Sequence, residues 1–81
     1  MRITVRFFAL LRDRAGVSQT ELDLAQGASV ASAVVTVGER FPEIKTLMPR
    51  IAYAVNQAYV DRTTLLYEGD ELALIPPVSG G

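Results

Sequence analysis

Hydrophobic and polar residues alternate at the start of the chain, from Arg2 to Phe8. Every second position in this stretch is hydrophobic: Ile3, Val5 and Phe7. A period of two predicts a β-strand with one face toward the core and the other toward solvent. Phe8 falls on the solvent face of that strand, where an aromatic side chain is unusual and needs an explanation.

The next two stretches extend this pattern. Residues 9–16, with the sequence ALLRDRAG, predict a short helical turn that ends at Gly16, since glycine readily adopts the left-handed conformation that stops a helix. Alternation returns in residues 20–24, with Leu22 and Leu24 directed inward. The short connection predicts that these first two strands pair antiparallel.

Residues 29–41 contain two conflicting signals. Hydrophobic residues recur at helical spacing after Ser29, which is a good N-cap residue, but the VVTV run is β-branched and has poor helix propensity. Periodicity and the stop at Pro42 favour a helix. Pro42 is then expected to open a short turn that runs through Met48 and is ended by Pro49.

The last third of the chain predicts three more strands. Residues 51–55 and 58–60 flank Asn56-Gln57, which occupies the position of a hairpin turn. A Gly-Asp turn in residues 67–71 precedes the final strand, 72–75. Alternation directs Leu72 and Leu74 inward and three residues outward: Glu71, Ala73 and Ile75. Pro76-Pro77 donates no ladder hydrogen bond, so the sheet ends there.

The predicted order is β-β-α-β-β-β. This order indicates an α+β fold of the β-grasp (ubiquitin-like) type, a mixed sheet of about five strands crossed by one main helix. The first and last strands lie side by side and parallel in such a fold. We therefore expect one β-grasp domain over residues 1–77 and a flexible C-terminal Gly-Gly tail over 78–81.

Composition narrows the possible functions. The chain has 81 residues, enough for one domain, and its net charge of −1 indicates neither nucleic acid nor an anionic membrane as a partner. No apolar run is long enough for a membrane span and no signal peptide is apparent, so the cytoplasm is the expected location. The sequence contains no Cys and no His, which excludes thiolate nucleophiles and imidazole acid–base chemistry. Asp70-Glu71 lies in a predicted turn, and we expect no metal site and no catalysis by this chain alone.

The final residues, PPVSGG, raise a choice between a frayed end and a functional terminus. Termini are often disordered, which explains such an ending without any function. Alternatively, Gly80 and Gly81 lack a Cβ atom and suit a backbone that is threaded through a narrow channel.

Four segments together resemble a known family. They are FFALLRDRAG at 7–16, AVNQ at 54–57, GDELALIPP at 69–77 and the closing GG. In this order along nearly the whole chain they are similar to the small subunit of molybdopterin synthase, the MoaD family. Asp13 stands where that family more often has Glu.

The resemblance implies a sulfur carrier with a ubiquitin-like fold. An E1-like adenylating enzyme (MoeB-type) would use ATP and Mg²⁺ to adenylate the carboxylate of Gly81, and sulfur would then replace AMP to give a thiocarboxylate. That tail would donate sulfur to cyclic pyranopterin monophosphate in the active site of the large subunit, MoaE. The family pattern implies two small and two large subunits, and no cofactor bound by this chain itself.

A docking surface beside the tail follows from alternation and the expected strand order. Phe8 and Ile75 both point outward on neighbouring strands, and Tyr59 lies just past the Asn-Gln turn. A contiguous apolar patch at this position suits a partner interface, although single exposed apolar residues are common on any protein. The other partner-binding candidates are Arg12 at the rim and the exit segment Pro76, Pro77, Val78 and Ser79.

Three other functions fit the same tail. A thiamin-pathway sulfur carrier shares the fold and the activation chemistry, and a ubiquitin-like modifier would join the activated Gly81 to lysines of other proteins. In an interaction domain with an idle tail, loss of Gly81 would have no effect. Lys45 is the single lysine of the chain, which argues against self-linked chains through side chains.

Overall fold

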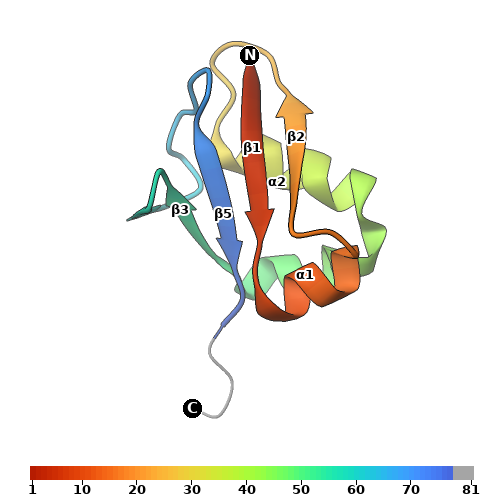
Figure 1. The fold of residues 1–81 in the computed structure, drawn as a ribbon. Coiled ribbons are helices and arrows are strands. Elements are labelled where there is room, and N and C mark those ends of the chain that lie inside the picture. The colour runs from red at the N-terminus through yellow and green to blue at the C-terminus, as the bar shows by residue number, and fades with distance from the viewer. Residues whose placement is uncertain (78–81) are drawn as a thin grey trace.

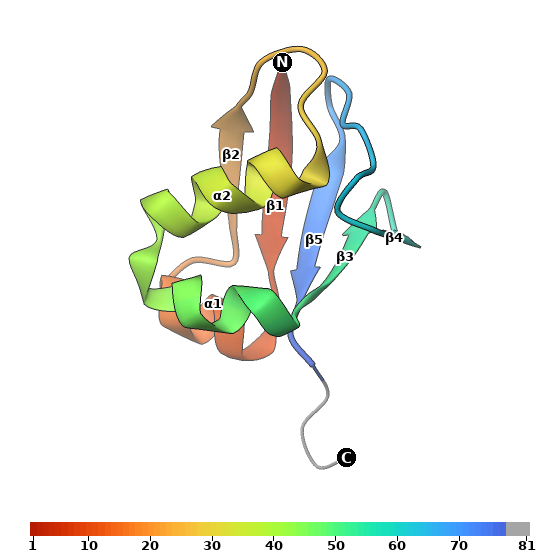
Figure 2. The ribbon, with the colours of Figure 1, turned by 180° about the vertical axis from the view of Figure 1, so that it is seen from behind.

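The structure, a computed structural model, describes residues 1–77. A five-stranded mixed sheet is crossed on one face by the main helix (Figures 1 and 2). The elements in chain order are β1 (Arg2–Phe7), α1 (Ala9–Ala15), β2 (Gln19–Asp23), α2 (Val30–Arg40), the 3₁₀ helix η1 (Pro42–Arg50), β3 (Ala52–Val55), β4 (Ala58–Val60) and β5 (Glu71–Ile75). The predicted α+β β-grasp fold is confirmed.

The strand order is β2-β1-β5-β3-β4. β1 is antiparallel to β2 and parallel to β5, with Thr4 opposite Glu71 and Phe7 opposite Leu74. The first and last strands are therefore neighbours, as expected. Because they run in the same direction, the C-terminal ends of both strands lie at the same end of the sheet, beside α1 at the bottom of Figure 1.

The core lies between the sheet and α2. Its largest fully buried side chains are Phe7, Ile3, Leu11, Ile44, Leu66, Leu72 and Leu74. Most of these occupy positions that alternation directed inward. Ile44 and Leu66 come from a 3₁₀ helix and a loop, where no periodic pattern marks the buried residue. The backbone N–H of Leu66 donates to the carbonyl of Ala28 at 2.9 Å, which holds this loop against the start of α2.

Helix α2 forms although it contains the β-branched run VVTV. The hydroxyl oxygen of Ser29 accepts a hydrogen bond from the backbone N–H of Ser32 at 3.3 Å, which is an N-cap. Val30 and Val37 are fully buried on one side of the helix. Burial of that face outweighs the small propensity penalty of β-branched residues, so the helix prediction is confirmed.

Several predicted boundaries were wrong by a residue or two. The second strand is Gln19–Asp23 rather than 20–24, and the last strand begins at Glu71 rather than at residue 72. β1 ends at Phe7 because Phe8 is the residue that precedes α1. Pro49 lies inside η1 rather than after it, and the helix continues to Arg50. β3 begins at Ala52, since Ile51 is the buried residue that closes η1.

The Asn56-Gln57 turn is confirmed. Both residues have positive φ, at 50° and 73°, and Val55 pairs with Ala58 directly across the loop. A two-residue loop with two positive φ values is a type I′ turn, the geometry that suits the twist of a hairpin.

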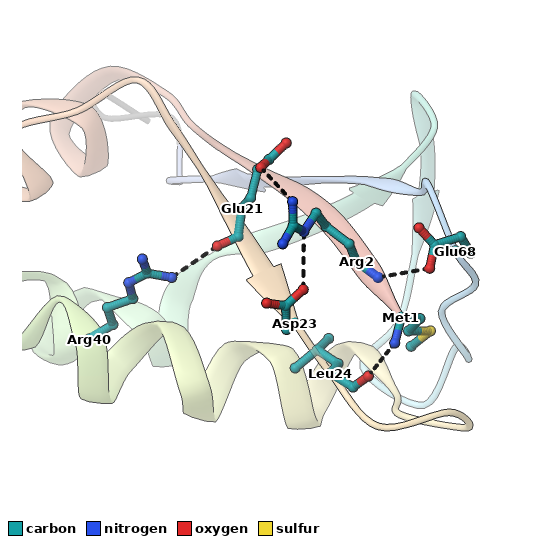
Figure 3. A network of polar contacts seen from close by, with 7 residues as sticks. All are labelled: Met1, Arg2, Glu21, Asp23, Leu24, Arg40 and Glu68. Atoms are coloured by element: carbon teal, nitrogen blue, oxygen red, sulfur yellow. Dashed lines mark hydrogen bonds and ion pairs between the residues drawn. The ribbon is translucent and has the colours of Figure 1, made fainter.

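A polar network surrounds the start of β1, at the end of the strand away from α1 (Figure 3). Its seven members are Met1, Arg2, Glu21, Asp23, Leu24, Arg40 and Glu68. The Arg2 guanidinium donates to Asp23 Oδ1 at 3.1 Å, and this bond and its charge lower the pKa of Asp23. Arg40 donates to the Glu21 carbonyl oxygen at 2.9 Å, which ties the end of α2 to β2. Exposed ion pairs of this kind contribute little each, so we assign the network to alignment of β1, β2 and α2.

Substitution of glycine by alanine is expected to change the free energy of unfolding in opposite directions at two positions, Gly16 and Gly38. Gly16 ends α1 with a φ of 83°, where an L-residue is strained, so Gly16→Ala is expected to lower the free energy of unfolding by about 1–2 kcal/mol. Gly38 lies inside α2, and a Cβ there would meet Lys45 Cγ at 3.7 Å, an ordinary contact. Gly38→Ala should therefore raise the free energy of unfolding by about 0.5–1 kcal/mol. Urea unfolding measures both changes in free energy, provided that the m-value of each variant equals that of wild type. A change of the same sign in the two variants would contradict the prediction.

Candidate functional site

The sheet face opposite the core presents one continuous row of residues. Arg6 on β1 is opposite Ala73 on β5, Ala73 is opposite Ala54 on β3, and Ala54 is opposite Tyr59 on β4. Four strands therefore contribute one side chain each at the same level. Strand alternation places all four on the outer face, because neighbours such as Phe7 and Leu74 point into the core.

A concavity of about 430 Å³ opens along this row. We call it the outer concavity, and its lining residues are Arg6, Phe8, Ala54, Gln57, Tyr59, Glu71, Ala73 and Ile75. Ala54 and Ala73 are only 5% and 9% exposed, yet neither belongs to the main core cluster. Their small side chains form the floor, and the longer side chains around them form the walls.

Alternation predicted that Ala73 would point outward, and it does line the outer concavity. It is nevertheless buried, because a methyl group at the bottom of a hollow is hidden by its larger neighbours. The predicted face of Ala73 is therefore confirmed, and the structure adds that the residue is buried there.

Phe8 and Ile75 line the end of the outer concavity where β1 and β5 terminate. Phe8 has an extended backbone, with φ −123° and ψ 150°, and the next residue, Ala9, turns the chain with a φ of 49°. Ile75 is the last residue of β5 and is followed directly by Pro76. Both side chains are half-buried. The structure thus brings two predicted docking residues together at the point where the chain leaves the sheet after β5.

Tyr59 lies on the opposite wall. It is 75% exposed and belongs to β4, the short strand at the sheet edge. The structure therefore places three of the predicted partner-binding residues, Phe8, Tyr59 and Ile75, around one hollow. Their role in binding a partner stays a prediction.

Charge is present at one side of this apolar hollow. The Arg6 guanidinium carbon lies 5.2 Å from the centroid of the Phe8 ring, within the range of a cation–π contact. Arg6 Nη1 also lies 3.9 Å from Glu71 Oε2. The outer concavity therefore combines an apolar floor with a charged rim, the usual anatomy of a protein–protein interface.

The remaining predicted site residues lie elsewhere. Arg12 is exposed on α1 and is not among the residues that line the outer concavity, although α1 contacts β5. Pro76 is half-buried and Pro77 is exposed, and they continue the chain from Ile75. The predictions for Val78, Ser79, Gly80 and Gly81 lie outside the described residues.

Sequence reasoning did not single out five lining residues: Arg6, Ala54, Gln57, Glu71 and Ala73. Alternation alone predicted the outer-face position of Arg6, Glu71 and Ala73. What it lacked was the register between strands, which decides that Arg6 is level with Ala73 and Ala54.

Two features are absent from residues 1–77. Over this part of the chain there is no group of three or more carboxylate, imidazole or thiol side chains placed to hold a metal ion. None of the helices in the same range has the length and apolarity needed to cross a membrane.

The mixed sheet of order β2-β1-β5-β3-β4, crossed by α2, places this chain in the class of ubiquitin-like β-grasp proteins. The profile of the ThiS family matches residues 5–81, and the chain belongs to that family. A curated relative, the molybdopterin synthase sulfur carrier subunit of Chlamydomonas reinhardtii, is 36% identical over 83 residues, with full coverage of both chains.

Solved structures give the same fold. SAMP1 from Haloferax volcanii superposes with a TM-score of 0.93 at 27% identity, covering 100% of both chains. A putative molybdopterin converting factor, subunit 1, from Pyrococcus furiosus gives 0.87 at 29% identity, covering 96% of this chain and 99% of that one. The complex of subunits 1 and 2 of the molybdopterin-converting factor from Helicobacter pylori gives 0.74, with full coverage of both chains, at 24% identity, which shows the fold alone.

Proposed function

We propose that this chain is the sulfur carrier subunit of a molybdopterin synthase and carries sulfur as a thiocarboxylate on Gly81. The observation that supports this most is similarity over the whole chain, tail included, to relatives named as such subunits. The outer concavity supports it independently, because it provides a surface for a partner where β5 leaves the sheet.

The proposed activation explains how a chain without Cys transports sulfur. A carboxylate is a poor electrophile, since its leaving group would be oxide. Attack of a Gly81 carboxylate oxygen on the α-phosphorus of ATP releases pyrophosphate and forms an acyl adenylate. A sulfide-equivalent nucleophile then attacks the acyl carbon and displaces AMP, which leaves a thiocarboxylate. An E1-like adenylating enzyme (MoeB-type) supplies the ATP and Mg²⁺ site.

The proposed partner for sulfur delivery is the large subunit, MoaE, and the proposed acceptor is cyclic pyranopterin monophosphate. A complex of the two subunit types is known for the Helicobacter pylori fold neighbour. We propose that the large subunit covers the outer concavity with Phe8 and Ile75 at the centre of the contact, in an assembly of two small and two large subunits. Four residues beyond Pro77 span at most about 14 Å, which limits how far the sulfur is delivered from this surface.

Activation is testable with the isolated protein and its cognate adenylating enzyme. With ATP and Mg²⁺ the chain is expected to support pyrophosphate exchange, and with a sulfur donor its mass should rise by the exchange of one oxygen for sulfur. No covalent intermediate on a thiol of this chain is expected, because the sequence has no Cys. Exchange that persists with the Gly81 carboxylate blocked as an amide would refute the proposed chemistry.

A second candidate function is protein modification. It is favoured by the likeness to SAMP1, the small archaeal modifier protein 1 of Haloferax volcanii, at 27% identity and a TM-score of 0.93. In this alternative a lysine amine of another protein attacks activated Gly81 and forms an isopeptide bond. Adducts of the tagged chain in a lysate, resistant to thiol reductants and absent when Gly81 is deleted, would support modification. A thiocarboxylate without such adducts supports the carrier function.

A further inference from the structure

Two turns meet at the end of the outer concavity that lies away from Phe8 and Ile75. One is the Asn56-Gln57 turn between β3 and β4, and the other is the turn through Tyr67 and Asp70 that precedes β5. They are separated by fourteen positions between Asn56 and Asp70, yet these two side chains are in direct contact.

Asn56 forms three hydrogen bonds, one to Asp70 in the second turn and two to Glu71, the first residue of β5. Its side-chain Nδ2 donates to Asp70 Oδ1 at 2.9 Å, and its Oδ1 accepts from the backbone N–H of Glu71 at 2.9 Å. Its own backbone N–H donates to the Glu71 carbonyl oxygen at 2.8 Å. Side chain and backbone of Asn56 thus extend the β3–β5 ladder by one further residue.

Asp70 is bonded from three directions. Its second carboxylate oxygen accepts from the backbone N–H of Tyr67 at 2.9 Å, which closes its own turn. Its backbone carbonyl accepts from the N–H of Thr4 on β1 at 2.9 Å. The Asn56–Asp70 pair therefore links the β3–β4 hairpin, the turn before β5 and β1.

The residues adjoining this pair are those of the far wall of the outer concavity. Gln57 follows Asn56, Glu71 follows Asp70, and Tyr59 lies two residues further along the hairpin; all three line the hollow. Among residues 1–77, β4 pairs with β3 alone, so few other contacts fix the position of Tyr59.

We propose that Asn56 and Asp70 are positioning residues, which hold Gln57, Tyr59 and Glu71 in the arrangement that the partner binds. This inference rests on the proposed function, in which the large subunit covers the outer concavity. A surface fixed before binding loses less conformational entropy on association. Asn56 itself is not among the residues that line the hollow, so it acts through its neighbours.

The test compares affinities for the large subunit by calorimetric titration. Asn56→Gly is the best deletion variant, since glycine accepts the φ of 50° and only the side-chain bonds are lost. We expect it to weaken binding by about tenfold. Amide hydrogen exchange at Glu71, whose N–H donates to Asn56 Oδ1, should accelerate in the same variant.

Asp61→Ala is the matched control. Asp61 Oδ1 accepts from the backbone N–H of Thr63 at 2.8 Å, so this variant also removes a carboxylate that stabilises a turn, but Asp61 does not line the outer concavity. Its affinity should stay within about threefold of wild type, whatever its stability.

Swapping the two residues distinguishes a positioning role of Asn56 from a direct contact between Asn56 and the partner. Asn56→Asp alone places two carboxylates together and should bind weakly. Adding Asp70→Asn restores a donor, so the bond between the two side chains can re-form with position 70 as the donor. The backbone N–H groups of Glu71 and Tyr67 still donate to side-chain oxygens at positions 56 and 70. The double variant should recover to within about threefold of wild type.

The outcomes distinguish this inference from the function on which it rests. Absence of binding by the wild-type chain would refute the proposed partner. Wild-type binding with an equal affinity for Asn56→Gly would overturn the positioning role alone. The double variant would also overturn the positioning role if it bound weakly while amide hydrogen exchange at Glu71 had returned to the wild-type rate. Asn56 would then contact the partner directly.

Discussion

Deletion of Gly81 is expected to abolish sulfur transfer and to leave the fold unchanged. The carboxylate of Gly81 is the proposed reacting group, and deletion moves the chain end back by about 3.5 Å. Misplacement of a reacting group by 1 Å can cost about a hundredfold in rate, so sulfuration of the pterin should fall by at least that factor. Adding one residue after Gly81 moves the carboxylate in the other direction and should have the same effect.

Stability provides the control for this pair of variants. Glycine has no side chain to bury, and the buried core is formed by residues from Ile3 to Leu74. The melting temperature should therefore stay within about 3 °C of wild type. The large subunit should still bind both variants, because the outer concavity is intact. Sulfuration at the wild-type rate by the deletion variant would rule out the carrier function.

Replacement of Phe8 by Asp or of Ile75 by Lys is expected to weaken binding of the large subunit by at least about thirtyfold. Loss of an apolar anchor at an interface centre typically costs about 2 kcal/mol or more, which corresponds to that factor. Both side chains line the outer concavity at the end where β1 and β5 terminate. They are half-buried and lie outside the core cluster, so the free energy of unfolding should change by about 1 kcal/mol or less.

Val35→Asp is the matched control for these substitutions. Val35 is 61% exposed on α2, which packs on the core side of the sheet and thus away from the outer concavity (Figure 2). The same kind of change there should leave the affinity unaltered. Equal weakening by Val35→Asp, or a full affinity of Phe8→Asp, would show that the partner binds another face.

Local patterns in the sequence were sufficient to predict the helices and strands and their order. Alternation in residues 2–7 has one solution once a single face must be buried, since a shift of one residue would expose Ile3, Val5 and Phe7 together. Gly16, Ser29 and the Asn56-Gln57 pair act on backbone groups only a few residues away. Signals of this short range are contained in the sequence itself, and the α+β fold followed from their order.

The floor and the far wall of the site were decided by tertiary structure. Ala54 and Ala73 are buried on the outer face because β3 and β5 align them, and nothing in the sequence indicates that either residue is buried there. Asn56 and Asp70 were placed correctly in two separate turns, but their contact depends on β5 lying between β1 and β3.

The sequence by itself determined which strand residues face outward, the order of the strands along the chain and their bounds to within a residue or two, and that no thiol or imidazole is available for chemistry. The tertiary structure decided which of those outward residues share one hollow. The physical reason is range: side-chain alternation and turn preference are local, whereas strand register is set by core packing and hydrogen bonds between residues far apart in the chain, such as Arg6 with Ala73 and Asn56 with Glu71.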